Sequence, residues 1–320
     1  SGIPGGERDG LTMVWDGVDM RRWMDLHSAV TMAPLEQAWM YGDAIGAGSP
    51  YTPTRGVISR VGGKPVAIVQ ALEWSLGGVM KLAKVVRGPL FLKDVTEDEC
   101  VAVHQLIADR WPMPRLNWFF FSPEMVDADF ACSVMDRLKL KRTVTGYSTA
   151  WIDLTVGADR LRAGLHQKWR NQLLAAEGEK LRVRDAHSGQ AMSWLLERYE
   201  ADRKRRRFRA TTGAFAAALA ICAPRPRDVL LLLAERGSEP IAGVLFLRHG
   251  FSATYQIAYT SEAGRAANAN RLLVWEGMRR LAADGVRWLD MGGIDASMAG
   301  VSRFKLGTGA APVTLVGTWM

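Results

Sequence analysis

The sequence predicts an α+β fold made of two similar units in tandem, each with a mixed sheet flanked by helices. Each half of the 320-residue chain has helices, then two β-rich runs around a Gly/Pro turn, then a third strand, a helix and another strand. The two turns also match in type, Gly62-Gly63-Lys64-Pro65 in one half and Gly237-Ser238-Glu239-Pro240 in the other. Repetition at about half the chain length indicates a duplicated domain, and we expect the units to span residues 11–150 and 151–320.

The elements of the first half follow from periodicity. Strands are expected where β-branched and aromatic residues lie between turn residues, and helices where apolar residues recur every three or four positions. These patterns predict strands at residues 11–15, 54–61, 66–74, 80–86, 117–121 and 148–154, and helices at residues 19–27, 34–41, 96–111 and 127–138. The first ten residues are small and polar, so they are expected to be flexible.

The second half repeats the plan. Strands are predicted at residues 181–185, 228–235, 241–249, 252–259, 286–290 and 312–318, and helices at residues 161–177, 189–208, 212–223 and 270–284. The helices between residues 161 and 208 are too short for a long coiled-coil arm, so none is expected.

Composition narrows the classes of function. No apolar run approaches the roughly 18 residues that a membrane span needs, and no charged-then-apolar leader is visible, so a cytoplasmic location is expected. The net charge of +8 favours an anionic partner such as nucleic acid, a nucleotide or an anionic lipid surface, which would allow a peripheral membrane contact. The three cysteines form no CxxC pair and the five histidines have no metal-binding spacing, so no metal is expected. No GxSxG elbow or Walker loop occurs.

One lysine stands out near the C-terminus. A predicted strand at residues 286–290 ends at Gly292-Gly293, a short polar loop follows, and the chain then reaches Phe304-Lys305. Ligands of α/β sheets usually sit beyond the ends of the strands. The alternative interpretation is a lysine on a solvated turn, since lysines are usually exposed.

Several motifs in order resemble one family. They are Pro34-Leu35-Glu36-Gln37-Ala38-Trp39, Arg87-Gly88-Pro89-Leu90, Trp151-Ile152-Asp153-Leu154, Lys168-Trp169-Arg170-Asn171, Leu289-Asp290-Met291-Gly292-Gly293-Ile294 and Arg303-Phe304-Lys305. Together they resemble the Fem-type aminoacyltransferases, which are built from two acetyltransferase-like (GNAT) units and use aminoacyl-tRNA. The resemblance implies an acceptor side in the first unit, and a donor and catalytic side in the second.

The resemblance also implies roles for residues. Phe304 and Lys305 match the family's catalytic pair, in which the lysine stabilises the negative charge that develops when an amine attacks the aminoacyl ester; a fixed cation there would lower the barrier. The basic run at residues 203–209 looks equivalent to a segment that binds the anionic acceptor, and Arg203, Arg205 and Arg209 are the candidates. A solvated charged helix face is the alternative.

Further substrate-binding candidates are Lys168, Trp169 and Asn171, which could form a wall for the tRNA acceptor end, or could equally cap a helix and pack the domain junction. Trp39 and Tyr255 complete the set. Relatives can carry a lysine four residues after Trp39, but here Asp43 occupies that position. Since an acid would repel a diphosphate, we expect a small, peptidic or amine-bearing acceptor.

Two other functions remain open. An acyl-CoA-dependent N-acyltransferase would need a phosphate-binding loop at residues 260–270, which hold one glycine and match that pattern only loosely. The other is a non-catalytic RNA- or envelope-binding module. For the amide-forming enzyme, aminoacyl-tRNA is a co-substrate and no further cofactor is expected. Asp43, Asp290 and Asp295 are candidate general bases.

Overall fold

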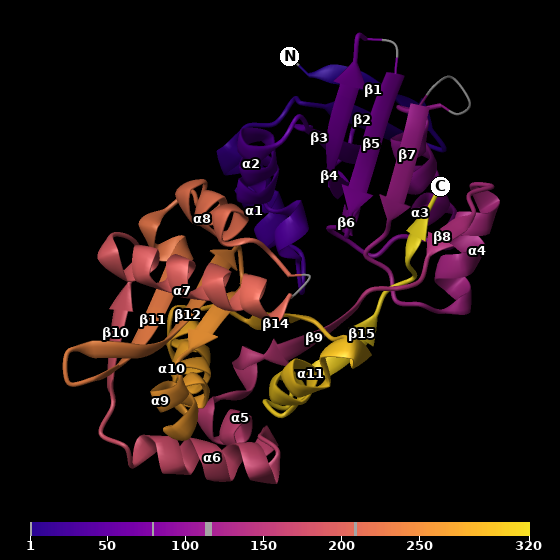
Figure 1. The fold of residues 1–320 in the computed structure, drawn as a ribbon. Helices are drawn as coiled ribbons and strands as arrows, with labels where there is room; N and C mark the ends of the chain where they lie inside the picture. Colours follow the sequence, from indigo (N-terminus) through magenta and orange to yellow (C-terminus); the bar gives the residue numbers. More distant parts are fainter. Residues whose placement is uncertain (1, 79, 113–116, 208–209) are drawn as a thin grey trace. The chain divides into compact units, whose positions relative to one another are not determined.

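The computed structural model describes residues 2–78, 80–112, 117–207 and 210–320, and it divides into two compact units (Figure 1). The first unit is Ser1–Ser148 with Val313–Met320, and the second is Thr149–Pro312. Each unit holds one mixed sheet and its own helices, which confirms the α+β fold with two units.

The first sheet has the strand order β1-β2-β3-β4-β5-β7-β16-β8, with β6 paired to β4. The described neighbours are antiparallel except β5 and β7, which are parallel. The strands are β1 (Ile3–Arg8), β2 (Leu11–Trp15), β3 (Thr52–Arg60), β4 (Pro65–Leu76), β5 (Met80–Val86), β6 (Leu90–Phe91), β7 (Asn117–Ser122), β8 (Arg142–Val144) and β16 (Thr318–Trp319). The β3–β4 hairpin predicted from the Gly/Pro turn is present.

The expectation of a flexible N-terminus is wrong. Ile3–Arg8 forms β1, an edge strand paired with β2. The small residues that suggested flexibility permit close packing instead, because a side chain at Gly5 would come within 2.8 Å of the Trp15 ring.

The helices of the first unit are α1 (Met20–Ser28), α2 (Trp39–Gly48), α3 (Glu97–Ala108) and α4 (Asp129–Arg137). Thr96 and Glu99 close a capping box that begins α3. Side chains of α3 and α4 share a core with one face of the sheet, including Ala83, Phe119 and Phe121.

The second sheet has the order β10-β11-β12-β13-β14-β9-β15. Its strands are β9 (Ser148–Asp153), β10 (Arg182–Ala186), β11 (Val229–Arg236), β12 (Glu239–His249), β13 (Ser252–Thr260), β14 (Trp288–Gly293) and β15 (Ala311–Thr314). β13 and β14 are parallel, as β5 and β7 are in the first sheet. Both units therefore contain an antiparallel hairpin, a third antiparallel strand and a further strand parallel to the third.

The helices of the second unit are α5 (Ala158–Gly164), α6 (Gln167–Glu177), α7 (Gln190–Arg206), α8 (Gly213–Ile221), α9 (Glu262–Ala266), α10 (Ala269–Ala283) and α11 (Ala299–Leu306). α7, with 17 residues, is the longest helix described, so no coiled-coil arm is seen within the described chain. None of the described helices has the length and apolar character to cross a bilayer.

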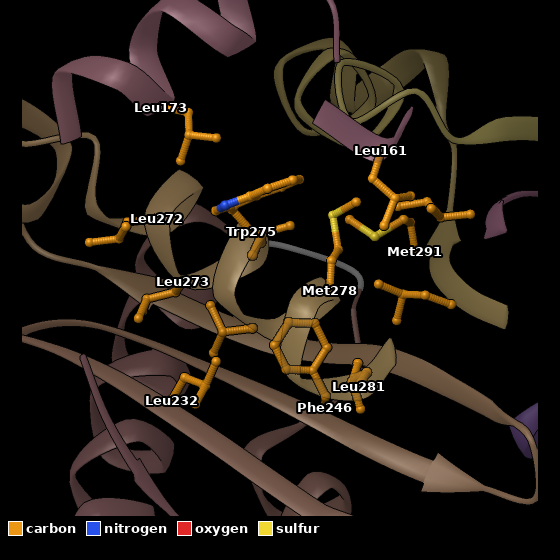
Figure 2. Close-up of a cluster of buried hydrophobic side chains, with 14 of the residues drawn as sticks. Leu161, Leu173, Leu232, Phe246, Leu272, Leu273, Trp275, Met278, Leu281 and Met291 are labelled. Carbon is orange, nitrogen blue, oxygen red and sulfur yellow. The ribbon is translucent and has the colours of Figure 1, made fainter. Parts of the chain in front are cut away.

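Helix α10 organises the core of the second unit. Figure 2 shows its Leu273, Trp275 and Met278 side chains packed with Phe246 of β12 and other apolar groups. Gly277 allows this approach, because any side chain there would overlap the Phe246 ring.

Three expected elements are divided in the structure. The helix expected at residues 34–41 is a single 3₁₀ turn at Leu35–Gln37 and then α2, with Ala38 extended between them. The helix expected at residues 161–177 breaks between α5 and α6, where the His166 amide donates to the Gly307 carbonyl at 2.9 Å. The strand expected at residues 312–318 is two short strands, of which β15 joins the second sheet and β16 the first.

Candidate active site

The parallel pairing of β13 and β14 stops partway along β13, and the predicted lysine lies near that point. Thr254 and Asp290 are the last partners of the parallel ladder, so Tyr255 and Gly292-Gly293 lie just beyond it. Gly292 has φ +72°, a conformation that disfavours other residues. A side chain at Gly292 would begin 3.5 Å from the Lys305 amine, an ordinary contact distance, so the positive φ is the reason that glycine is favoured here.

Lys305 lies on the last turn of α11 and points back to the strand end. Its Nζ donates to the Gly293 carbonyl at 2.8 Å. Burial lowers the pKa of Lys305 to about 8, and the nearby Asp290 carboxylate opposes that change. The amine is therefore mainly protonated at pH 7 and close to its titration point. This is an oriented cation at the place where strand ends usually meet a ligand.

Asp290 supports this arrangement from inside the sheet. Its carboxylate, 2% exposed, accepts hydrogen bonds from the Thr149 hydroxyl of β9 and from the Gly292 amide at 2.8 Å. Hydrogen bonds thus link Thr149 to Asp290, and Asp290 to the turn at Gly292. The carbonyl of the next residue, Gly293, accepts the hydrogen bond from Lys305. Because Asp290 already accepts both of these bonds, it supports the turn and is poorly placed to serve as a general base.

Phe304, the neighbour of the lysine in the chain, packs in an aromatic pair. Phe304, half-buried, packs against the Trp169 ring with centroids 6.0 Å apart. Trp169 is 3% exposed, because it lies on the inner face of α6 and Gly307 lets the chain pass close to it. The guanidinium of Arg271 lies 5.4 Å from the centre of the Phe304 ring. The structure therefore brings Trp169, Phe304 and Lys305 together, and adds Arg271, which the sequence did not single out.

Tyr255 faces the same core region from β13. Its ring meets Phe246 edge to face at 5.9 Å. Burial raises the pKa of Tyr255 to about 12, with a smaller opposing effect from a hydrogen bond to Asn270. The phenol is therefore neutral at physiological pH and can act as a hydrogen-bond donor.

Lys168 and Asn171 lie on the outer face of α6. Both are exposed, and the Asn171 carbonyl oxygen accepts from the Gln167 side chain at 2.8 Å. The structure separates these two residues from buried Trp169, their neighbour in sequence, by the rotation of the helix.

The basic run is paired with acids that precede it on α7. Arg203 donates to Glu200 at 2.7 Å, and Arg205 pairs with Asp202. Arg203 holds the pKa of Glu200 at about 2, with help from the Gly213 amide of α8. Arg209 lies outside the described residues. The acids at i−3 could have been found in the sequence, since residues three or four apart meet on a helix.

Trp39 and Asp43 lie together in the first unit on α2, and a third residue joins them. Arg55 of β3, 7% exposed, stacks on Trp39 with its guanidinium 3.5 Å from the ring centre, and donates to Asp43 at 2.8 Å. Its Nε also donates to Gln70 of β4 at 2.8 Å. Arg55 therefore offsets the negative charge of Asp43, which weakens the argument that Asp43 would repel a diphosphate.

The first unit also has a cavity of about 300 Å³. It opens where the parallel ladder of β5 and β7 ends, at Val86 and Ser122; in the second unit, Thr254 and Asp290 end the corresponding parallel ladder of β13 and β14. Arg87 lies in its wall and donates twice to Glu124, at 2.8 and 2.9 Å. The remaining lining includes Glu36, Pro123, Tyr147 and Leu315. Trp39 and Asp43 are not among the residues that line it.

The segment at residues 260–270 does not fit coenzyme A well. It forms α9 and the start of α10 instead of an open loop, and the Gly264 amide is already bonded to the Ser261 hydroxyl at 3.1 Å. The amides of Arg265, Ala267 and Asn268 are bonded within the segment too. These groups are the kind that would hold a diphosphate.

Within the described residues, no group of three or more His, Cys, Asp or Glu side chains could hold a metal ion. Cys100, Cys132 and Cys222, all within the described residues, form no disulfide, and Cys100 is buried.

Comparison with known proteins agrees with this geometry. Residues 160–311 match the acetyltransferase (GNAT) domain family. No curated protein sequence gave a significant match. The structure of FemX superposes with a TM-score of 0.79 over 95% of this chain and 96% of that chain, at 13% identity.

Two other structures are similar over nearly their whole length. A conserved protein of unknown function from Bacteroides thetaiotaomicron gives a TM-score of 0.63 at 10% identity, over 95% of this chain and 97% of that chain. A tandem GNAT protein from the clavulanic acid biosynthesis pathway gives 0.53 at 13% identity, over 97% of each chain. By fold, then, the chain is similar to FemX and to a tandem GNAT protein, and residues 160–311 of its second unit match the acetyltransferase (GNAT) domain family.

Proposed function

We propose that the protein transfers an aminoacyl group from aminoacyl-tRNA to the amine of a small or peptidic acceptor, forming an amide. The observation that carries the proposal is Lys305, a protonated amine fixed at the strand edge by the Gly293 carbonyl. The similarity to FemX supports the choice of reaction class.

In the proposed reaction the neutral amine attacks the ester carbonyl of the donor. A carbon–nitrogen bond forms, and the carbonyl oxygen becomes an oxyanion that the Lys305 ammonium stabilises. When the tetrahedral intermediate collapses, the bond to the ribose oxygen breaks, and the proton lost by the amine is taken up by that hydroxyl. Removing one such oxyanion donor typically slows a reaction by about 10²–10³-fold.

The three carboxylates considered as general bases have other partners. Asp290 accepts from Thr149 and Gly292, and Asp43 is paired with Arg55. The Asp295 carboxylate accepts from the Ser297 amide at 2.7 Å, which lowers its pKa. We therefore assign no side chain as the base.

We assign the donor and the catalytic step to the second unit and the acceptor to the first. The cavity of about 300 Å³ supports a small acceptor group, because it lies at the lower end of the size range of ligand pockets. Phe304 and Trp169 would shape the donor site. Arg203 and Arg205, on the surface of α7, would bind an anionic acceptor or the tRNA.

The acyl-CoA alternative keeps one supporting observation, the match of residues 160–311 to the GNAT domain. Changing Gly264 is an unsuitable test of it. Any side chain at Gly264 would overlap the Ile241 carbonyl, so a substitution would disturb the fold whether or not coenzyme A binds.

The test is transfer of radiolabel from total aminoacyl-tRNA to a panel of amine acceptors, with and without ribonuclease. We expect transfer that ribonuclease abolishes, and a loss of at least 100-fold in Lys305→Met. Lys64→Met, in the exposed β3–β4 turn, is the matched control. Transfer from acyl-CoA that is indifferent to ribonuclease would refute the proposal. RNA binding without any transfer would indicate the binding module instead.

A further inference from the structure

A β-bulge in β14 lies directly before the carbonyl that holds Lys305. On β14, Asp290 pairs with Trp151 of β9. Gly293 follows three residues later and pairs with Thr149, which is only two residues from Trp151, so β14 has one extra residue here. A bulge bends its strand and changes the direction of the groups beside it. The Gly293 carbonyl, which accepts from the Lys305 Nζ at 2.8 Å, therefore takes its direction from the bulge.

The bulge is held by one carboxylate with donors on two sides. Asp290 accepts from the Gly292 amide, inside the bulge, at 2.8 Å, and from the Thr149 hydroxyl on the facing strand. The first bond closes the bulge within β14, and the second ties it to β9. Thr149 is 0% exposed and Asp290 is 2% exposed. Hydrogen bonds to an ionised group are among the stronger ones in proteins.

Thr149 is itself firmly placed, because β9 brings the chain into the second unit. Thr149 is the first residue of that unit, and β9 lies between β14 and β15 in the sheet. The hydroxyl of the preceding residue, Ser148, is hydrogen-bonded to that of Thr314 in β15 at 2.8 Å. The support for Lys305 therefore extends beyond its own helix to a strand more than 150 positions earlier in the chain.

We propose that the Thr149 hydroxyl is a positioning group for the transfer reaction. It holds the Asp290 carboxylate, which fixes the bulge, and the bulge directs the Gly293 carbonyl to the Lys305 amine. Thr149 takes part in no bond making or breaking. The inference rests on the proposed function for the role of Lys305 as the group that stabilises the oxyanion.

Thr149→Val keeps the shape of the side chain and removes the hydroxyl. A misplacement of about 1 Å can slow a reaction about 100-fold. Because the Gly292 amide still holds Asp290, we expect a smaller loss, about tenfold in kcat, with the KM for the donor unchanged.

The second expected effect is on the titration of the lysine. The Asp290 carboxylate opposes the lowering of the Lys305 pKa by burial. A carboxylate that is held less firmly opposes it less, so the Lys305 pKa should fall in Thr149→Val by about 0.5, a part of the 1–3 that a nearby opposite charge typically contributes. A residue that only packs the sheet would leave this pKa unchanged.

The experiment titrates Lys305 in the full chain by NMR of ¹³C-labelled lysine side chains, with its signal assigned by its loss in Lys305→Met. Transfer from aminoacyl-tRNA gives kcat and KM for the same proteins. Thr149→Ser keeps the hydroxyl and should have the wild-type kcat and pKa. Thr155→Val is the matched control. It removes another threonine–aspartate hydrogen bond of the second unit, from Thr155 to Asp153 at 2.6 Å in an exposed turn, and should change neither quantity.

The two readouts separate this proposal from the proposed function. If the Lys305 pKa in Thr149→Val stays at the wild-type value, Thr149 only supports the sheet, and the proposal is overturned even if the melting temperature falls. If the pKa falls and Thr149→Ser restores it, the positioning network stands. If the wild type then transfers no aminoacyl group, it is the proposed reaction that fails.

Discussion

Replacing Lys305 by methionine should destroy activity and stabilise the protein, because the folded chain holds an amine in an unfavourable place. Burial lowers the pKa of Lys305 from 10.5 to about 8. At about 1.4 kcal/mol for each tenfold change, this corresponds to a cost of ~3 kcal/mol for keeping the amine charged. Methionine of similar length removes that cost and loses one hydrogen bond, worth ~1 kcal/mol. The expected gain is ~2 kcal/mol at pH 7.

The pH dependence gives the sign of this effect. Between pH 8 and 10.5 the unfolded chain keeps the lysine proton and the folded protein has lost it. The stability of the wild type therefore rises with pH in this window, relative to that of Lys305→Met. Above about pH 10.5 the lysine is neutral in both states, and the advantage of methionine disappears.

Urea unfolding followed by circular dichroism at pH 7 and pH 10 measures the difference in unfolding free energy between wild type and Lys305→Met, and its change with pH. Lys64→Met is the exposed control. Other lysines and tyrosines titrate in all three proteins, so the differences between proteins carry the result. A Lys305→Met protein that is less stable than wild type at pH 7, or whose difference from wild type does not change with pH, would refute the reasoning.

Three further outcomes are expected. Asp290→Asn removes the carboxylate that opposes the lowering of the Lys305 pKa, so the loss of transfer activity at alkaline pH should begin at a lower pH. If the rate at pH 6 falls as much as the rate at pH 8, the substitution does not act through the pKa of the lysine. Gly277→Ala overlaps the Phe246 ring and should cost ~1–3 kcal/mol in urea unfolding; an unchanged midpoint would show that the helix shifts freely. Arg55→Met leaves its buried partners without a donor and should cost ~2 kcal/mol, measured in the same way and contradicted by a change under 0.5 kcal/mol.

The sequence predicted the strand edge and its lysine because the signals are local. A buried strand, two glycines and the returning Phe304-Lys305 lie within 20 residues. The register of Arg55 with Gln70, and its reach to Asp43, depend on strand pairing and on the placement of α2. A single sequence gives no such distances, so the charge of Asp43 was judged without its partner.

Other differences have the same origin. The His166 amide leaves the helix to bond with Gly307, a residue 141 positions away, and periodicity alone cannot show that competition. Arg271 was hidden for another reason. Its neighbours are the rings of Trp169 on α6 and Phe304 on α11, which only the fold brings to it.

The division of the C-terminal residues between the sheets has a consequence for synthesis. Residues 313–320 belong to the first unit, where β16 pairs with β7 and β8. On the ribosome, the second unit therefore has all of its strands by Thr314, while the first still lacks β16. The N-terminal part of the first unit ends at Ser148, and β16 begins 170 residues later at Thr318. At about 5–20 residues per second, the edge of β7 therefore stays unpaired for on the order of 10 to 30 seconds. Exposed edges promote wrong pairing, so this interval is the stage at which the nascent chain most needs protection by chaperones.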